Sequence, residues 1–228
     1  MRPAMKPASR SAAMRAAGLL AMLALSGLVL AGALDPPGPP APTMVTLQQI
    51  YDKISGGVAK TGQVVCIDSS GNTINCSGTG QDGALQKGVS VSPRYTDNGN
   101  GTVRDNLTGL IWLKNANCFG QRNWSQALTD ASGVASGSCG LTDGSSAGMW
   151  RLPNAREQRS LIDLVTTYPA LTPGHPFTGL QTFGYWSSTT YPIPGQQDFG
   201  IFVHTGNGFV QPDIKTTPYY VWPVRGGQ

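Results

Sequence analysis

The chain has 228 residues, of which 30 are Gly and only 12% are charged, a composition typical of an extracellular, loop-rich domain and unlike that of a cytosolic helical enzyme. Four of its 16 Lys and Arg lie in the first 33 residues, whereas all 12 Asp and Glu follow them. The remainder is therefore neutral, so nucleic acid is not an expected partner, and its length suits one hydrophobic core with an N-terminal extension.

Residues 1–33 have the pattern of an export signal. A basic start is followed by an uncharged run over residues 16–34, and Ala31-Gly32-Ala33 offers small residues for cleavage after Ala33. The run is also long enough to span a bilayer, so an uncleaved anchor is the alternative and would be the protein's only membrane contact. We expect an exported protein, located in the periplasm, outside the cell or on its surface.

Residues 34–43 are Pro-rich and predict an extended linker. An extension over residues 44–93 follows, beginning with a short helix, Leu47 to Ser55, capped by Thr46 and ended by Gly56-Gly57. Its apolar face either packs on its own domain or contacts another protomer.

Four cysteines in an exported chain predict two disulfides. Cys66 and Cys76 bracket a hairpin turn, and Cys118 and Cys139 would close a loop around a helix. No CxxC occurs and the two histidines stand alone, so no zinc site is expected and local pairing is favoured.

The main domain is predicted over residues 94–228. Segments 95–97, 102–105 and 110–113, separated by Asn-Gly-type turns, form a predicted three-stranded meander. Asp97, Asn98, Asn100 and Asp105 weakly resemble a calcium loop, but their spacing fits no EF-hand, so no cofactor is expected and calcium remains only an alternative.

Two helices are predicted inside this domain. Asn123 caps the first, which carries Trp124, Ala127, Leu128 and Ala131. The second follows a short strand over residues 150–152, where Pro153 stops the strand and Asn154 with Glu157 forms a capping box. Its apolar residues Leu161, Ile162, Leu164 and Val165 predict a helix to about Tyr168, after which His175 lies in a loop.

The C-terminal residues are predicted to be β structure. Residues 185–189 form one strand, residues 199–204 and 208–211 form a hairpin across Thr205-Gly206-Asn207, and residues 219–225 close the chain. Pro223 predicts an edge or a bulge in that last segment.

Five segments in this order resemble the Lcl C-terminal domain family, named after a bacterial collagen-like adhesin: RYTDNGNGTVRDNLTGLIWLKNANC (94–118), CGLTDGSSAGMWRLPNAREQRSLID (139–163), GHPF (174–177), YWSSTTY (185–191) and YYVWPVRGG (219–227). The resemblance implies an α+β, C-type-lectin-like fold in which two helices flank a small, twisted, mostly antiparallel sheet and the first and last strands pair. Met149 stands where family members often carry an acid. Ten residues are expected to have structural roles: Trp112, Trp124, Trp150, Arg151, Pro153, Asn154, Glu157, Trp186, Trp222 and Arg225.

The resemblance also implies a secreted or surface-displayed, non-enzymatic binding module for an extracellular glycan or protein. Sugar rings bind aromatic side chains that lie beside amides and carboxylates. The C-terminal β region offers eight candidates: Tyr191, Gln197, Asp198, His204, Asn207, Phe209, Lys215 and Tyr219. Only Lys215 and Arg225 are basic there, so a heparin-like ligand is less favoured.

Two other functions remain open. An enzyme related to formylglycine-generating enzymes is disfavoured because every cysteine has a structural partner and no catalytic constellation is visible. A subunit of a surface assembly, for example a trimer projected by the linker and the Leu47–Ser55 helix, is compatible with binding.

Overall fold

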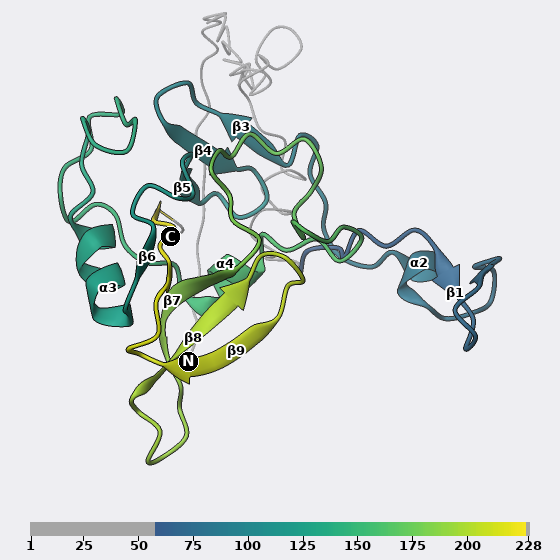
Figure 1. Cartoon of the computed structure of the whole chain (residues 1–228). Coiled ribbons are helices and arrows are strands. Elements are labelled where there is room, and N and C mark those ends of the chain that lie inside the picture. The colour runs from purple at the N-terminus through teal and green to yellow at the C-terminus, as the bar shows by residue number, and fades with distance from the viewer. Residues whose placement is uncertain (1–57, 227–228) are drawn as a thin grey trace, which may run out of the picture. The chain divides into compact units, whose positions relative to one another are not determined.

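A four-stranded sheet, a five-stranded sheet and a separate hairpin make up the described part of the chain (Figure 1). The structure is a computed structural model and describes residues 58–226, so the predicted signal, linker and Leu47–Ser55 helix lie outside it. The strands are β1 (Cys66–Ile67), β2 (Thr73–Ile74), β3 (Tyr95–Asp97), β4 (Thr102–Asp105), β5 (Ile111–Leu113), β6 (Gln121–Arg122), β7 (Gly184–Thr190), β8 (Phe199–His204), β9 (Val210–Ile214), β10 (Tyr219–Tyr220) and β11 (Val224–Arg225). The helices are α2 (Asp82–Leu85), α3 (Trp124–Ser132) and α4 (Ala155–Arg159). The predicted α+β class is confirmed.

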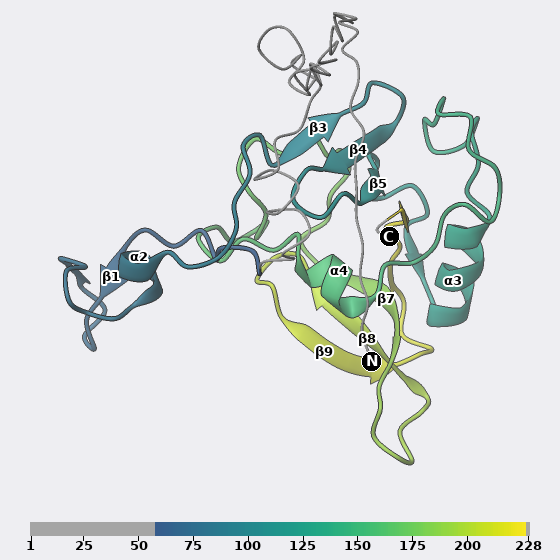
Figure 2. The same cartoon turned by 180° about the vertical axis from the view of Figure 1, so that it is seen from behind.

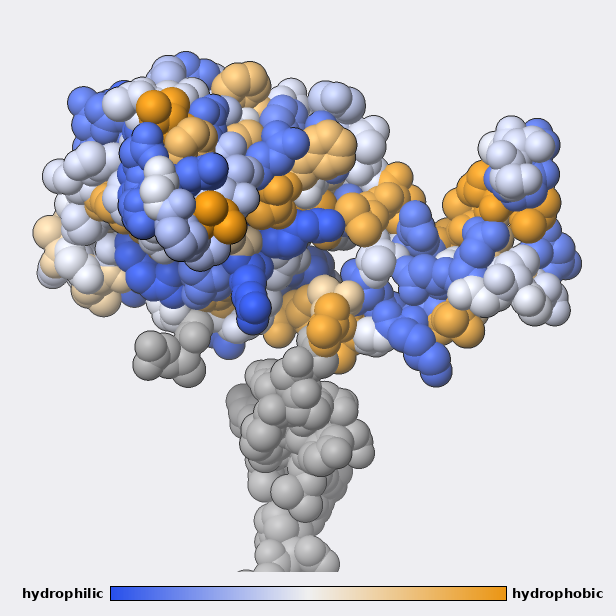
Figure 3. Space-filling model, turned by 90° about the horizontal axis from the view of Figure 1, so that it is seen from below, coloured by the Kyte–Doolittle hydropathy of each residue, from blue (hydrophilic) through white to orange (hydrophobic). Residues whose placement is uncertain are grey.

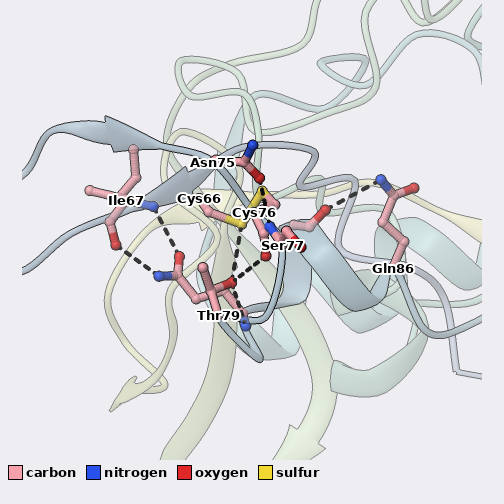
Figure 4. Close-up of a disulfide and its surroundings, with 9 residues drawn as sticks. Cys66, Ile67, Asn75, Cys76, Ser77, Thr79 and Gln86 are labelled. Atoms are coloured by element: carbon pink, nitrogen blue, oxygen red, sulfur yellow. Dashed lines mark hydrogen bonds between the residues drawn. A yellow bond between two sulfur atoms is a disulfide. The ribbon is translucent and has the colours of Figure 1, made fainter.

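The extension contains the predicted disulfide hairpin (Figure 4). Cys66 and Cys76 are bonded with their Cα atoms 5.2 Å apart, and Asp68 N–H donates to the Asn72 carbonyl at 2.9 Å to close the turn. The Gln81 side chain pairs with both the N–H and the C=O of Ile67, each at 2.9 Å, as a neighbouring strand would. Apolar side chains nevertheless remain exposed on this extension (Figure 3): Val64, Val65, Ile67, Ile74 and Leu85.

The predicted meander forms the four-stranded sheet, whose strand order is β11-β5-β4-β3. Trp112 in β5 lies opposite Val103 on one side and Val224 on the other. The closing strand therefore returns to the sheet of the opening meander. This closing strand, β11, pairs with β5. The first strand of the meander, β3, lies at the other edge of the sheet, so the expected pairing of the first and last strands is wrong for β3.

The five-stranded sheet has the order β6-β10-β7-β8-β9, with every pairing antiparallel except β10–β7. The closing segment predicted over residues 219–225 is divided into two strands, β10 and β11. Pro223 lies between them, where the chain passes from this sheet to the other, and not at an edge or a bulge of one strand. The predicted hairpin is confirmed, although β9 starts at Val210 and runs on to Ile214. Pro212 is tolerated in β9 because that strand lies at the sheet edge.

The tryptophans define two hydrophobic clusters. Trp112, Trp150 and Trp222 are at most 1% exposed and belong to the larger cluster. Trp186 belongs to the smaller one, together with Ala127 and Ala131 of α3. Trp124 is half-buried, and its indole N–H donates to the Ser187 carbonyl at 2.8 Å.

Helix α3 begins where predicted. The Asn123 side chain accepts from Gln126 N–H at 2.9 Å, and the Gln126 side chain accepts from Asn123 N–H, which completes a capping box. Cys118 and Cys139 are bonded around this helix, with their Cα atoms 5.5 Å apart. Both predicted disulfides are therefore present.

The corner before α4 is also confirmed. Trp150 and Leu152 are buried while Arg151 between them is exposed, and Arg151 forms backbone bonds of 3.0 and 2.9 Å with Val224. The Asn154 side chain accepts from Glu157 N–H at 2.9 Å, and Glu157 accepts from Asn154 N–H at 2.8 Å. Partial burial alone would raise the pKa of Glu157, but its paired bonds with Arg151 and the Asn154 N–H outweigh that effect and lower the pKa.

The predicted length of this helix is wrong, because α4 ends at Arg159 rather than near Tyr168. Ile162 forms a bridge with Leu171, and Asp163 N–H donates to the Ala170 carbonyl at 2.9 Å. The backbone groups of residues 162 and 163 therefore pair with a later part of the chain and do not continue the helix. Leu164 and Val165 are left 43% and 50% exposed.

The cap on α4 gives a direct test of this corner. Asn154→Ala should lower the free energy of unfolding by about 1 kcal/mol, because two N–H groups of the first turn lose their acceptor. Asn154→Ser keeps a side-chain oxygen that can accept these bonds, so it should lower the free energy of unfolding much less. Urea denaturation measures both, and equal losses would contradict the capping role.

Candidate functional site

Seven of the eight predicted ligand-contacting residues lie at the two ends of the β8–β9 hairpin, whereas Tyr219 lies in β10 (Figure 1 and Figure 2). His204, Asn207 and Phe209 are at its turn, whereas Tyr191, Gln197, Asp198 and Lys215 are at its open end. The two ends are roughly 20 Å apart, at about 3.3 Å per strand residue. A small ligand could therefore contact only one of the two groups.

At the open end, Lys215 is engaged in internal contacts. Its ammonium group lies 4.4 Å from the centroid of the Trp124 ring and donates to the Gln197 carbonyl at 2.6 Å. Its backbone N–H donates to the Asp198 carbonyl at 2.8 Å. Lys215 thus joins the hairpin to α3 and to the 191–198 loop, and its charge is not free for an anionic ligand.

Tyr219 belongs to the smaller hydrophobic cluster more than to the surface. Its ring stacks on Phe202, with the centroids 4.3 Å apart, and its hydroxyl donates to Asp213 at 2.8 Å. Burial, together with the carboxylate acceptor, raises the pKa of Tyr219. Tyr219 is thus half-buried, and its ring serves mainly this cluster.

The turn end carries three exposed rings and one half-buried ring, which we call the aromatic patch: Tyr168, Phe183 and Phe209, with His204 half-buried among them. Tyr168 is 66% exposed, Phe209 58% and Phe183 44%. The Phe183 and His204 rings are 5.9 Å apart. Exposed apolar side chains that cluster in this way are typical of binding surfaces.

Backbone contacts hold the patch together. Tyr168 N–H donates to the Gly206 carbonyl at 2.7 Å, and His204 N–H donates to the Phe209 carbonyl at 2.8 Å. A Cβ atom on Gly206 would lie 2.8 Å from His204 Cε1 and 3.1 Å from Tyr168 Cδ1. Only glycine therefore lets the Tyr168 and His204 rings approach the turn from both sides.

Two donors lie at this turn, one on His204 of the patch and one on Asn207 beside it. His204 Nδ1 accepts from Gly206 N–H at 3.1 Å, so in neutral histidine the proton is on Nε2, which can donate to a ligand. The Asn207 side-chain oxygen accepts from Phe209 N–H at 3.1 Å, which leaves its NH₂ group as a donor. Rings beside amide and imidazole donors can bind a hydroxylated ring.

Sequence reasoning missed Tyr168 and Phe183. Tyr168 was placed at the end of a helix, and Phe183 precedes a strand without any local signal of exposure. The early end of α4 brings Tyr168 to the Gly206 turn, and this contact links residues 38 positions apart. Only the Pro169 that follows Tyr168 argued against helix at this position.

The predicted calcium motif is divided between two ion pairs. Asp97 pairs with Lys114 at 2.7 Å, and Asp105 pairs with Arg94 at 2.8 Å. Asp105 lies opposite Tyr95, at the other end of β3 from Asp97. Within residues 58–226, no three His, Cys, Asp or Glu side chains are placed to hold a metal ion.

His175 lies in the predicted loop, half-buried beside Phe177, with the ring centroids 5.7 Å apart. Burial lowers the pKa of His175. Neutral imidazole is therefore the form favoured at this position.

A cavity of about 290 Å³ lies away from all eight predicted residues. The extension supplies one side, with Lys60, Asp82 and Val89, and the main domain supplies the other, with Arg94, Ile162 and Asp163. Sequence reasoning missed it because these residues are up to 103 positions apart in the chain.

The family model described as "Lcl C-terminal domain" matches residues 101–225, more than half of the chain. The match begins inside the predicted domain of residues 94–228 and ends close to its end. No curated protein matches the chain. Between residues 58 and 226, none of the helices has the length and hydropathy needed to cross a bilayer.

Proposed function

Because the chain belongs to the Lcl C-terminal domain family, we propose that it is an exported, surface-associated binding module without enzymatic activity, and that its ligand is a carbohydrate. The aromatic patch is the observation that carries this proposal. Its three exposed rings offer flat apolar faces, and His204 Nε2 and the Asn207 amide offer donors for hydroxyl groups.

The patch favours neutral sugars over sulfated ones. No Lys or Arg is among its four residues, and Lys215 at the other end of the hairpin is held by Trp124 and Gln197. Arg159 Nη1, which would lie 3.7 Å from a Cβ atom on Gly208, adds one positive charge beside the turn, too little for a sulfated chain. Binding to a neutral glycan should therefore depend little on salt, since few surface charges take part.

A glycan array followed by calorimetry tests the proposal. The double variant Tyr168→Ala/Phe209→Ala should bind the strongest array glycan at least about tenfold more weakly, because exposed rings supply most of the apolar contact. Its thermal stability should hardly change, since both side chains are mainly exposed.

Tyr191→Ala/Ile193→Ala is the matched control, because it removes one aromatic and one exposed apolar side chain from the open end of the hairpin. It should bind like the unaltered protein. An array without any bound glycan, or loss of binding only in the control, would refute the proposal.

The same proposal includes a C-type-lectin-like scaffold. Two helices beside mainly antiparallel sheets, and a closing strand that returns to the sheet of the opening meander, support it. The structure differs from the simplest form of that scaffold in that β3 does not pair with β11.

The absence of enzymatic activity is a proposal supported by the cysteines. Chemistry of the formylglycine-generating type needs reactive thiols, whereas all four cysteines form disulfides. Titration of the native protein should therefore find no free thiol, and a reactive one would revive the enzymatic alternative.

An assembly subunit is the second candidate, favoured by the apolar residues that are exposed on the extension. Light scattering of the exported protein with and without residues 44–57 tests it. A monomer in both cases would remove the Leu47–Ser55 helix as an oligomerisation element.

A further inference from the structure

We propose that the cavity between the extension and the main domain binds a free α-amino acid with an apolar side chain. This second site is separate from the aromatic patch and does not depend on the carbohydrate proposal. The cavity is defined by Lys60, Asp82, Val89, Arg94, Ile162 and Asp163.

The volume of the cavity limits the size of its ligand. At about 290 Å³ it lies at the lower end of the range of roughly 300–1,000 Å³ that is usual for small-molecule sites. A single amino acid suits this volume better than a sugar chain or a peptide.

The lining carries charges of both signs. Lys60 takes part in none of the ion pairs formed within residues 58–226. Asp163 forms no ion pair there either, and its carboxylate accepts from Val165 N–H at 2.8 Å and from the Thr172 hydroxyl at 3.5 Å. A lysine ammonium and a carboxylate that each keep bonding capacity match the carboxylate and the ammonium group of a zwitterion.

The segment that carries Lys60 passes directly beside Asp163. A Cβ atom on Gly62 would lie 2.8 Å from Asp163 Oδ1, so this carboxylate contacts the chain only two residues from Lys60. Two segments in contact thus supply a lysine and a carboxylate to the same cavity. One small zwitterion, such as a free amino acid, suits such a pair of charges.

Hydrogen bonds fix the cavity on both sides. Leu164 N–H donates to the Thr61 carbonyl at 3.0 Å, and the Thr61 hydroxyl donates to Asp82. Arg94 is fixed by two bonds to Asp105 and one to the Ser160 carbonyl. The backbone beside Lys60 and the side chains of Asp82 and Arg94 are thus positioned before a ligand arrives, which reduces the entropy lost on binding.

The apolar part of the lining supplies the side-chain preference. Val89 and Ile162 line the cavity, from the extension and from the main domain respectively. We expect leucine, isoleucine or valine to be preferred over glycine or aspartate, because only the larger apolar side chains can cover these residues.

Calorimetry with L-leucine, N-acetyl-L-leucine and L-leucinamide tests the assignment on the exported protein. L-Leucine should bind at millimolar concentration or below with one site per chain. The capped compounds lack either the ammonium or the carboxylate charge, and each should bind about tenfold more weakly or worse.

Lys60→Gln should weaken L-leucine binding by about tenfold or more without changing the melting temperature, because Lys60 has no ion-pair partner within the described residues. Lys87→Gln is the matched control, since Lys87 is exposed on the same extension but does not line the cavity. It should bind like the unaltered protein.

Three results would overturn the assignment: no binding of L-leucine, equal binding of the capped compounds, or unchanged binding by Lys60→Gln. The aromatic-patch variant Tyr168→Ala/Phe209→Ala should retain L-leucine binding. Failure of one site is therefore distinguishable from failure of the other.

Discussion

Replacing Trp222 with alanine should lower the free energy of unfolding by about 3–5 kcal/mol, the usual cost of truncating a large buried aromatic side chain. Trp222 is fully buried, and its ring centroid lies 4.8 Å from Phe177, 5.3 Å from Trp112 and 5.5 Å from Tyr185. Since these rings come from β5, β7 and a loop, truncation leaves a cavity where the two sheets meet. Denaturant unfolding followed by circular dichroism measures the change.

Trp222→Phe provides a milder variant in case the alanine protein does not fold. It keeps an aromatic ring but loses the indole N–H that donates to the Leu113 carbonyl at 2.8 Å. The expected loss is about 1–3 kcal/mol, since a buried carbonyl is left without its partner. A loss of less than about 1 kcal/mol for Trp222→Ala would contradict the central position given to this residue.

Asp105→Asn should have the second large effect, a loss of about 3–5 kcal/mol. The Asp105 carboxylate is fully buried and accepts from Arg94 at 2.8 and 3.0 Å, from the Thr108 hydroxyl at 2.7 Å and from Leu107 N–H at 3.0 Å. The amide keeps the size of the side chain but leaves the charge of Arg94 uncompensated. Thermal and urea unfolding measure the loss.

Asp97→Asn is the control, because its carboxylate pairs with Lys114 in a neighbouring part of the same meander but is 36% exposed. Its effect should be much smaller and should diminish further in high salt, since exposed ion pairs are screened. Equal effects of the two variants would show that burial of Asp105 does not determine its contribution.

The features that could be predicted from sequence are those set by neighbouring residues. The capping boxes at Asn123 and Asn154, the Asn-Gly turns of the meander and the Cys66–Cys76 hairpin are each encoded within a dozen positions. Local sequence determines these structures because hydrogen bonds of side chains and turns form within the segment itself.

The features that were missed depend on contacts between distant segments. Apolar periodicity predicted a helix to Tyr168, but residues 162 and 163 pair instead with residues 170 and 171. In the same way, β11 selects β5 rather than β3 because Val224 completes the large cluster beside Trp112. Periodicity alone does not contain this information.

The candidate site was predicted only in part for the same reason. His204, Asn207 and Phe209 follow from a recognisable hairpin turn, whereas Tyr168 and Phe183 join them only through the backbone contact with Gly206 and the ring contact with His204. In the sequence, Lys215 is a candidate to contact a ligand. The structure places its ammonium group over the ring of Trp124, which lies 91 positions earlier and so could not be identified as its partner.

Hydroxyl-radical footprinting of the exported protein, with and without the strongest glycan from the array, tests the location of the binding surface most directly. We predict that bound glycan protects Tyr168, Phe183 and Phe209 from oxidation and leaves Tyr191 unchanged. Protection of Tyr191 and Ile193 without protection of the aromatic patch would contradict the account.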